Sequence, residues 1–119
     1  MDNLREARMI RAIDGDTYDI EFAAMPGDMF RVRIIGIDCP EVRRNKAKGI
    51  DDEHVARGKA AKQFVVNLLP PGSTIWIASE GRNTDLWGRL RRHIWFDNKT
   101  QNLANVLLET GHAIVYVWR

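Results

Sequence analysis

Hydrophobic and polar residues alternate along three stretches near the start of the chain, over residues 8–13, 17–22 and 30–35. A period of two is typical of a β-strand that buries one face. An Asp-Gly pair at 14–15 and a Pro-Gly pair at 26–27 separate the stretches, and such pairs favour tight turns. The pattern therefore predicts a meander of three antiparallel strands, in which Arg31 and Arg33 lie on the face opposite the apolar side chains.

Two helical patterns and two further strand patterns follow. Residues 42–52 lack periodicity and carry four basic residues ahead of two acids, which predicts a mobile basic loop. A helix is predicted to begin between Glu53 and Lys59 and to end before the prolines at 70–71. Residues 74–78 and 90–96 predict two strands separated by a polar loop at 79–89. A second helix is predicted from Asn102 to Thr110, ahead of an extended apolar tail. The first helix has an apolar stripe at helical spacing (Ala56, Ala60, Ala61, Phe64, Val65 and Leu68).

The order of these elements indicates the fold. Five short strands with one helix between the third and the fourth fit a small closed barrel of the OB type better than a sandwich. Strands and helices do not alternate regularly, which argues against a doubly wound parallel sheet. We therefore expect an α+β, mainly β fold, a five-stranded OB-fold barrel with two helices. It would span residues 1–119 as a single domain, with residues 1–7 as a flexible N-terminal segment.

Composition narrows the class of protein. The chain has 119 residues, of which 45% are hydrophobic and 29% charged, as in a globular protein and against disorder. No apolar run approaches the roughly 20 residues of a membrane helix, so no membrane partner is expected. One cysteine, Cys39, excludes an internal disulfide. A net charge of +2 permits a polyanionic partner without implying one.

The cellular location and the oligomeric state stay open at this point. The segment at the amino terminus is polar and carries mixed charge, so it does not resemble a signal peptide. A cytoplasmic location follows if Met1 is the native start, and a secreted or periplasmic one if an export signal has been removed. The sequence does not decide between a monomer and a dimer.

Candidate chemistry is concentrated at the two ends of the segment 14–41. Asp14 and Asp16 stand at its start, Asp38 and Glu41 at its end, and two alternating arginines precede the second acidic group. If the fold brings the ends together, carboxylate oxygens and guanidinium groups share one pocket. That combination suits a divalent cation and a phosphate together.

Three blocks of sequence closely resemble the staphylococcal nuclease (thermonuclease) family, in the family's order and spacing. They are residues 13–17 (Ile-Asp-Gly-Asp-Thr), 31–41 (Arg-Val-Arg-Ile-Ile-Gly-Ile-Asp-Cys-Pro-Glu) and 85–90 (Asp-Leu-Trp-Gly-Arg-Leu). The resemblance covers nearly the whole chain from Met9 onward. It implies an OB-fold barrel with a Ca²⁺-dependent nuclease activity that cuts DNA and RNA, prefers single-stranded or breathing regions, and leaves 3′-phosphate ends.

The resemblance also implies a calcium site. Asp16 and Asp38 would be its carboxylate ligands, and the backbone carbonyl at the position of Cys39 would be the third protein ligand. Cys39 stands where a threonine is common in the family. Because the implied ligand there is the main chain, we expect calcium binding to survive this difference.

The remaining roles implied by the resemblance concern the substrate. Glu41 would position the attacking water and is the candidate base that deprotonates it. Arg33 and Arg89 would hold the scissile phosphate. Trp87 and Tyr116 occupy positions where the family usually has tyrosines that line the nucleotide pocket, so they are the candidate substrate-binding residues.

Two kinds of alternative stay open. The chain could be a catalytically silent nuclease-like OB-fold domain that binds single-stranded nucleic acid, although such domains lose acids or arginines that are present here. Asp14 could serve the turn or support the metal from outside, and Arg31 is interpreted as a solvated or ion-paired barrel residue. The histidines at 54, 93 and 112 show no ligand spacing.

Overall fold

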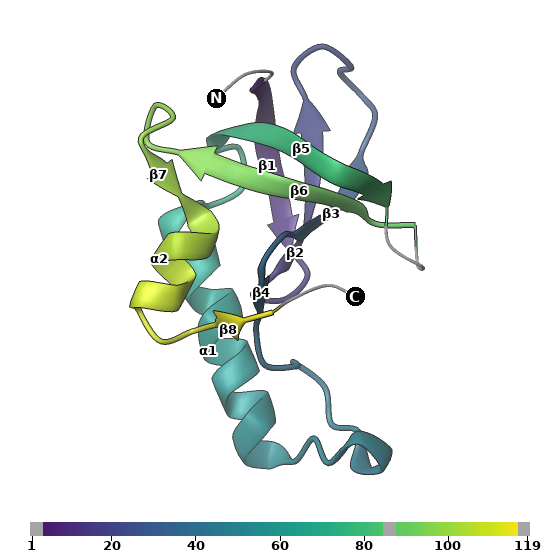
Figure 1. Cartoon of the computed structure of the whole chain (residues 1–119), viewed down its shortest axis with the longest axis vertical. Helices are drawn as coiled ribbons and strands as arrows, with labels where there is room; N and C mark the ends of the chain where they lie inside the picture. Colours follow the sequence, from purple (N-terminus) through teal and green to yellow (C-terminus); the bar gives the residue numbers. More distant parts are fainter. Residues whose placement is uncertain (1–3, 85–87, 117–119) are drawn as a thin grey trace.

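Three strands at the start of the chain form the predicted meander in the computed structural model, which describes residues 4–84 and 88–116, with the backbone alone at 80–83 (Figure 1). They are β1 (Arg5–Ala12), β2 (Thr17–Phe22) and β3 (Phe30–Ile34), and each pairs antiparallel with the next. β1 begins earlier than expected, so residues 5–7 are not part of a flexible segment. Ala7 is fully buried and pairs with Ile75 of a later strand, which holds this end of β1 in the sheet.

Two further strands close the sheet into a barrel. β5 (Thr74–Thr84) runs antiparallel to β1, and β6 (Leu90–Phe96) runs antiparallel to β5. β6 then pairs in parallel with β3, from Val32 opposite Leu90 to Ile34 opposite Arg92. This pairing joins the two edges of the sheet and confirms the OB-type barrel, mainly β with two helices. β5 extends beyond the predicted end at residue 78 because residues of the expected loop still pair with β6.

Several short elements were not predicted from the sequence. β4 (Ile37–Asp38) and β8 (Ile114–Val115) form a separate two-stranded ribbon. β7 (Gln101–Asn102) extends the sheet beside β6, and a 3₁₀ turn, η1 (Lys46–Lys48), lies in the basic loop. The ribbon matters for the candidate site because it fixes Asp38 against the segment that leads to the carboxyl end.

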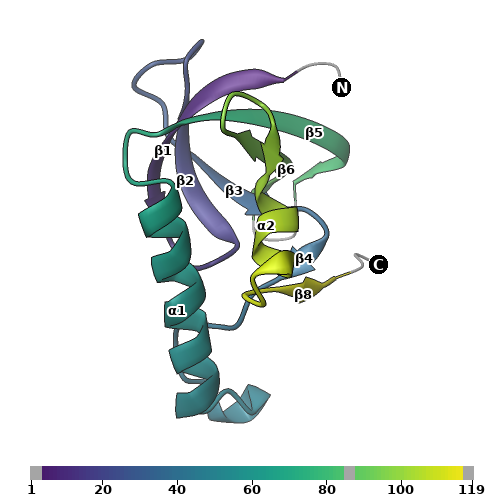
Figure 2. The same cartoon turned by 90° about the vertical axis from the view of Figure 1, so that its left-hand side faces the viewer.

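The two helices pack beside the barrel. α1 (Asp52–Leu68) lies on the β1 side of the barrel and extends beyond it, whereas α2 (Leu103–Glu109) lies under β6 (Figure 2). α1 begins at Asp52, one residue before the predicted range, because the side chain of Asp51 caps it by accepting a hydrogen bond from the backbone N of His54. No helix in the described part of the chain has the length and apolar character needed to cross a membrane.

The helix face that packs on the barrel is narrower than the predicted stripe. Gly58, Ala61 and Val65 are buried on α1, whereas Ala56 and Ala60 are exposed. The hydrophobic core fills the barrel and continues to both helices. Its members come from every long strand and both helices (Met9, Tyr18, Ile20, Val32, Ile34, Val65, Ile75, Ile94, Leu103 and Leu107).

Candidate active site

Asp16 lies in the turn between β1 and β2, and only 5% of the residue is exposed. Its backbone N donates a hydrogen bond to the Asp14 carboxylate at 3.0 Å, an arrangement that stabilises tight turns. Its own carboxylate oxygen Oδ2 accepts a hydrogen bond from the backbone N of Cys39 at 2.8 Å. The two ends of the segment 14–41 therefore meet in direct contact.

Arg33 bridges the two carboxylates from strand β3. Its Nη1 lies 3.4 Å from Oδ2 of Asp16, and its Nη2 lies 3.1 Å from Oδ1 of Asp38. The same guanidinium group donates to the carbonyl oxygens of Ile34 at 3.1 Å and Ile37 at 3.0 Å. Because these contacts fix both the plane and the position of the group, Arg33 is preorganised beside the acids.

The acids in this cluster outnumber the guanidinium groups that bind them. Burial raises the pKa of Asp38, and the charge of Asp16 raises it further, against the lowering effect of Arg33. Burial and the neighbouring Asp16 likewise raise the pKa of Asp14 to about 7. The raised pKa values of Asp38 and Asp14 indicate that their negative charge is unfavourable in the folded protein. A bound cation would therefore stabilise the ionised carboxylates.

Arg89 joins the cluster from the distant third block. It immediately precedes β6, and its Nη1 donates to Oγ1 of Thr17 at 3.4 Å. The Thr17 hydroxyl in turn donates to Oδ1 of Asp16 at 3.3 Å. Sequence reasoning did not assign a role to Thr17. Its place directly after Asp16 in the first block was the signal that could have identified it.

Glu41 is positioned by two contacts of helix α1 that the sequence did not predict. Its backbone N donates to Nε2 of His54 at 2.8 Å. A Cβ atom at Gly58 would lie 2.0 Å from the carbonyl oxygen of Glu41, so only glycine permits this approach. The Glu41 residue is exposed, and its charge contributes to the raised pKa of Asp38. His54 thus acts as a hydrogen-bond acceptor rather than as a metal ligand.

The remaining candidates lie at the edges of the cluster. The Cζ atom of Arg33 stands 5.9 Å from the ring centroid of Tyr116, within the range of a cation–π contact. The backbone N of Tyr116 donates to the carbonyl of Gly36 at 2.9 Å, which continues the β4–β8 ribbon. Cys39 is buried, and burial raises the pKa of its thiol. Trp87 lies outside the described residues.

The donors available for a cation are two carboxylates with like charge. Among the described residues, no three side chains of His, Cys, Asp or Glu converge as a metal-binding group. Calcium takes six to eight oxygen ligands and accepts main-chain carbonyls and water among them. Asp16 and Asp38 fit the carboxylate part of such a shell, because the repulsion that raises the pKa of Asp38 would be relieved by a cation between them.

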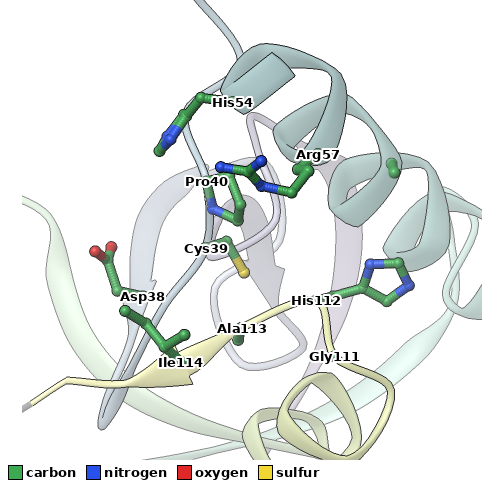
Figure 3. A pocket seen from close by; sticks show the side chains of 10 residues that line it. Asp38, Cys39, Pro40, His54, Arg57, Gly111, His112, Ala113 and Ile114 are labelled. Atoms are coloured by element: carbon green, nitrogen blue, oxygen red, sulfur yellow. The ribbon is translucent and has the colours of Figure 1, made fainter. Parts of the chain in front are cut away.

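A cavity of about 430 Å³ opens beside the cluster (Figure 3). It lies between α1 and the segment that follows α2, and Asp38 and Cys39 form one wall. The lining combines small or apolar residues (Pro40, Ala60, Gly111, Ala113 and Ile114) with three larger polar side chains (His54, Arg57 and His112). Of the two aspartates, Asp38 alone lines this cavity, and it shares the lining with Arg57 and the two histidines.

Fold and site together define the class of protein: a small OB-type barrel whose surface carries a cluster of aspartates and arginines. Residues 31–119 match the family described as staphylococcal nuclease homologue. The chain belongs to this family.

Three curated relatives are similar to the chain, and all are much longer proteins. Endonuclease YhcR of Bacillus subtilis is 25% identical over 109 residues, which is 91% of this chain and 9% of that protein. The uncharacterized lipoprotein MG186 homolog of Mycoplasma pneumoniae is 33% identical over 89 residues, 70% of this chain and 29% of that protein. The uncharacterized lipoprotein MG186 of Mycoplasma genitalium is 32% identical over 74 residues, 62% of this chain and again 29% of that protein. The chain thus corresponds to less than a third of each relative.

Proposed function

We propose that the chain is a Ca²⁺-dependent, sequence-non-specific endonuclease that hydrolyses phosphodiester bonds of DNA and RNA and leaves 3′-phosphate ends. The observation that carries the proposal is the contact of Asp16 with both Cys39 and Arg33, which assembles two distant blocks of sequence into one cluster. Arg89 adds the third block through Thr17. Family membership and the name of the Bacillus relative support a nuclease.

In this proposal each side chain has a separate task. Glu41 positions the attacking water and accepts its proton, a contribution typically worth about 10²–10⁴ in rate. Arg33 and Arg89 donate hydrogen bonds to the phosphoryl oxygens, where negative charge builds as water attacks phosphorus and the P–O5′ bond breaks. A calcium ion bound by Asp16 and Asp38 would supply further positive charge to oppose that build-up.

The proposed substrate range follows from contacts that do not distinguish the bases. Tyr116 lies beside Arg33, and Trp87 is proposed to line the same nucleotide pocket. Stacking of a base on an aromatic ring is worth roughly 1–3 kcal/mol and depends little on which base it is. Stacking requires unpaired bases, which is why we propose a preference for single-stranded or breathing regions.

The direct test is hydrolysis of single-stranded DNA and RNA by the purified protein with Ca²⁺ and with EDTA. We expect cutting that requires calcium, and end-group analysis that finds 3′-phosphates. Failure to cut either substrate under calcium, or equal cutting under EDTA, would refute the proposal. Glu41→Gln provides the matched inactive protein, because it keeps the size of the side chain and removes the base.

A second candidate function is a catalytically silent domain that binds single-stranded nucleic acid. One observation favours it: Arg33 is already bonded to two carboxylates, which leaves less of its guanidinium group for a phosphate. Comparison of Glu41→Gln with the unmodified chain separates the two functions. A nuclease keeps its affinity for an oligonucleotide and loses cutting, whereas a silent binding domain changes in neither respect.

We further propose that the chain acts outside the cytoplasm. Free calcium is scarce in the cytosol, so a calcium-dependent enzyme would be nearly idle there. The two mycoplasmal relatives are named lipoproteins, which supports an extracytoplasmic place of action. Fractionation of the source cells with an antibody against the chain tests this, and recovery in the cytosolic fraction alone would contradict it.

A further inference from the structure

An irregularity in β1 places two arginines on the same outer face of the barrel. Arg8 pairs with Glu21 and Arg11 pairs with Asp19, but the register shifts between Met9 and Arg11. In a regular strand, residues three apart point to opposite faces. The extra residue of a β-bulge restores Arg8 to the face of Arg11, and bulges commonly serve to re-aim a side chain in this way.

A third arginine completes the row across the meander. Arg31 of β3 pairs with Asp19 of β2, which pairs on its other side with Arg11 of β1. Nε of Arg11 lies 2.7 Å from Asp19 Oδ2, and Arg31 binds the same carboxylate through Nε at 2.9 Å and Nη2 at 3.1 Å. The three strands therefore present the side chains of Arg8, Arg11 and Arg31 on one continuous surface, called here the arginine face.

On the arginine face the positively charged side chains are exposed, whereas the acidic side chains that they bind are mostly buried. The side chains of Arg8 and Arg11 are 59% and 58% exposed, whereas the Asp19 side chain is 2% exposed and that of Glu21 is 17% exposed. Arg11 binds Asp19 through Nε alone, and neither of its terminal nitrogens has a partner among the described residues. Donors that point to solvent above buried carboxylates suit a ligand with repeated negative charge.

The arginine face is continuous with the candidate active site. Arg31 and Arg33 are two residues apart on β3, and their neighbours on β2, Asp19 and Thr17, are spaced in the same way. Two residues of strand span roughly 7 Å, so successive rows are separated by about the distance between neighbouring phosphates of an extended strand. Nucleic-acid binding on the outer face of strands 2 and 3 is a general property of OB barrels.

We propose that the arginine face binds the sugar–phosphate backbone of the nucleic-acid strand whose scissile phosphate lies at Arg33. The inference rests on the proposed nuclease function and extends it to a binding path that leads away from the cut. Each phosphate contact releases counterions, so the face contributes affinity that weakens with salt and carries no base preference.

The experiment compares two double variants that remove the same charge. Arg8→Gln with Arg11→Gln alters the arginine face and leaves the bonds from Arg31 to Asp19 in place. Lys59→Gln with Lys99→Gln is the control, because these exposed lysines lie on α1 and beyond β6. Binding of a single-stranded oligonucleotide of roughly 12 nucleotides, within the site size of OB folds, is measured against salt in the Glu41→Gln background with Ca²⁺.

The slope of log affinity against log salt is expected to fall by about 1.4 in the arginine-face variant, since each single-strand contact contributes about 0.7. The control should keep the slope of its parent. In the background with Glu41 intact, the arginine-face variant should lower kcat/KM for the oligonucleotide and leave that for a dinucleotide unchanged. If thermal unfolding shows that the double variant is unfolded, Arg8→Gln alone is expected to lower the slope by about 0.7.

The outcomes separate this inference from the proposed function. Cutting by the unmodified chain, together with equal slopes in both double variants, would overturn the arginine face and leave the nuclease intact. Absence of cutting together with a reduced slope would refute the nuclease and support the face as a binding surface. If the chain does not cut and the slope is not reduced, both the nuclease function and the arginine face are refuted.

Discussion

Two clusters of aspartate and arginine lie along strand β3, and the ratio of arginines to aspartates in one is the inverse of that in the other. In one, the single carboxylate of Asp19 is bound by two guanidinium groups, those of Arg11 and Arg31. In the other, the single guanidinium group of Arg33 is shared by the two carboxylates of Asp16 and Asp38. The residue types are the same, and only the stoichiometry differs.

The pKa directions follow from this stoichiometry. Hydrogen bonds from Arg31 chiefly lower the pKa of Asp19, with help from Arg11 and against the effect of burial. Burial and the charge of Asp16 raise the pKa of Asp38. The first cluster is electrostatically satisfied within the protein, whereas the second holds excess negative charge. Carboxylates whose pKa is raised by burial and by a neighbouring like charge are found often at functional sites.

The largest expected effect separates the two arginines of β3. Arg33→Gln should lower kcat on a dinucleotide by about 10²–10³, because it removes a preorganised donor to the phosphoryl oxygens. Arg31→Gln should leave that kcat unchanged, because its side chain binds Asp19 and lies outside the cluster. Steady-state kinetics of both variants provide the measurement. Similar losses in the two would show that the clusters do not differ in function.

The packing of α1 positions Glu41, which lies near the cluster of Asp16 and Asp38 and not near Asp19. Gly58→Ala should lower kcat by about 10²-fold, because its Cβ would displace the backbone of Glu41 by an ångström or more. Ala56→Gly, at an exposed position of the same helix, controls for helix propensity and should leave kcat unchanged. Kinetics of the two variants provide the measurement. Full activity of Gly58→Ala would mean that the position of Glu41 is not critical.

The free energy of unfolding should depend on Asp19 but not on Asp38. In EDTA, Asp19→Asn is expected to lower the free energy of unfolding by about 1.5–3 kcal/mol, the range for hydrogen bonds to charged groups. Asp38→Asn should not lower it, because it removes a charge whose raised pKa shows that the fold holds it at a cost. Denaturant titration of both variants is the measurement. A larger loss for Asp38→Asn would contradict the comparison.

The smallest expected effect is a difference in pH dependence. The pKa of Asp19 is lowered in the folded state, so its contribution to stability is present above the ordinary value of 3.8 and is lost as the pH falls through the lowered pKa. The unmodified chain should therefore lose more free energy of unfolding than Asp19→Asn between about pH 5 and pH 3. Parallel curves for the two proteins would show that Asp19 gains nothing from its arginines.

The strands that alternate clearly could be predicted from the sequence. β2 and β6 have the predicted bounds, and the second helix was predicted within one residue at each end. The ribbon of β4 and β8 was missed because two residues carry no periodicity. The bulge in β1 breaks the period of two, and this concealed both the start of the strand and the common face of Arg8 and Arg11.

The candidate site could be predicted only in part for a similar reason. The three blocks predicted which side chains would carry the chemistry, and the fold brings three of these, Asp16, Arg33 and Asp38, together. Contacts to the backbone depend little on residue type, so sequence patterns do not predict them. His54 and Gly58 contact the backbone of Glu41 because α1 packs against the segment that contains Glu41. Tertiary packing sets this position of the helix, and the local sequence does not encode it.

We propose that the excess negative charge around Asp16 and Asp38 serves a calcium-dependent hydrolysis. The most direct test is the rate of single-stranded oligonucleotide cleavage as a function of free Ca²⁺, for the unmodified chain and for Asp38→Asn. We expect a saturable dependence on calcium that EDTA abolishes, and a loss of activity in Asp38→Asn at every calcium concentration. Cleavage that persists in EDTA, or an Asp38→Asn variant with the calcium dependence of its parent, would contradict the claim.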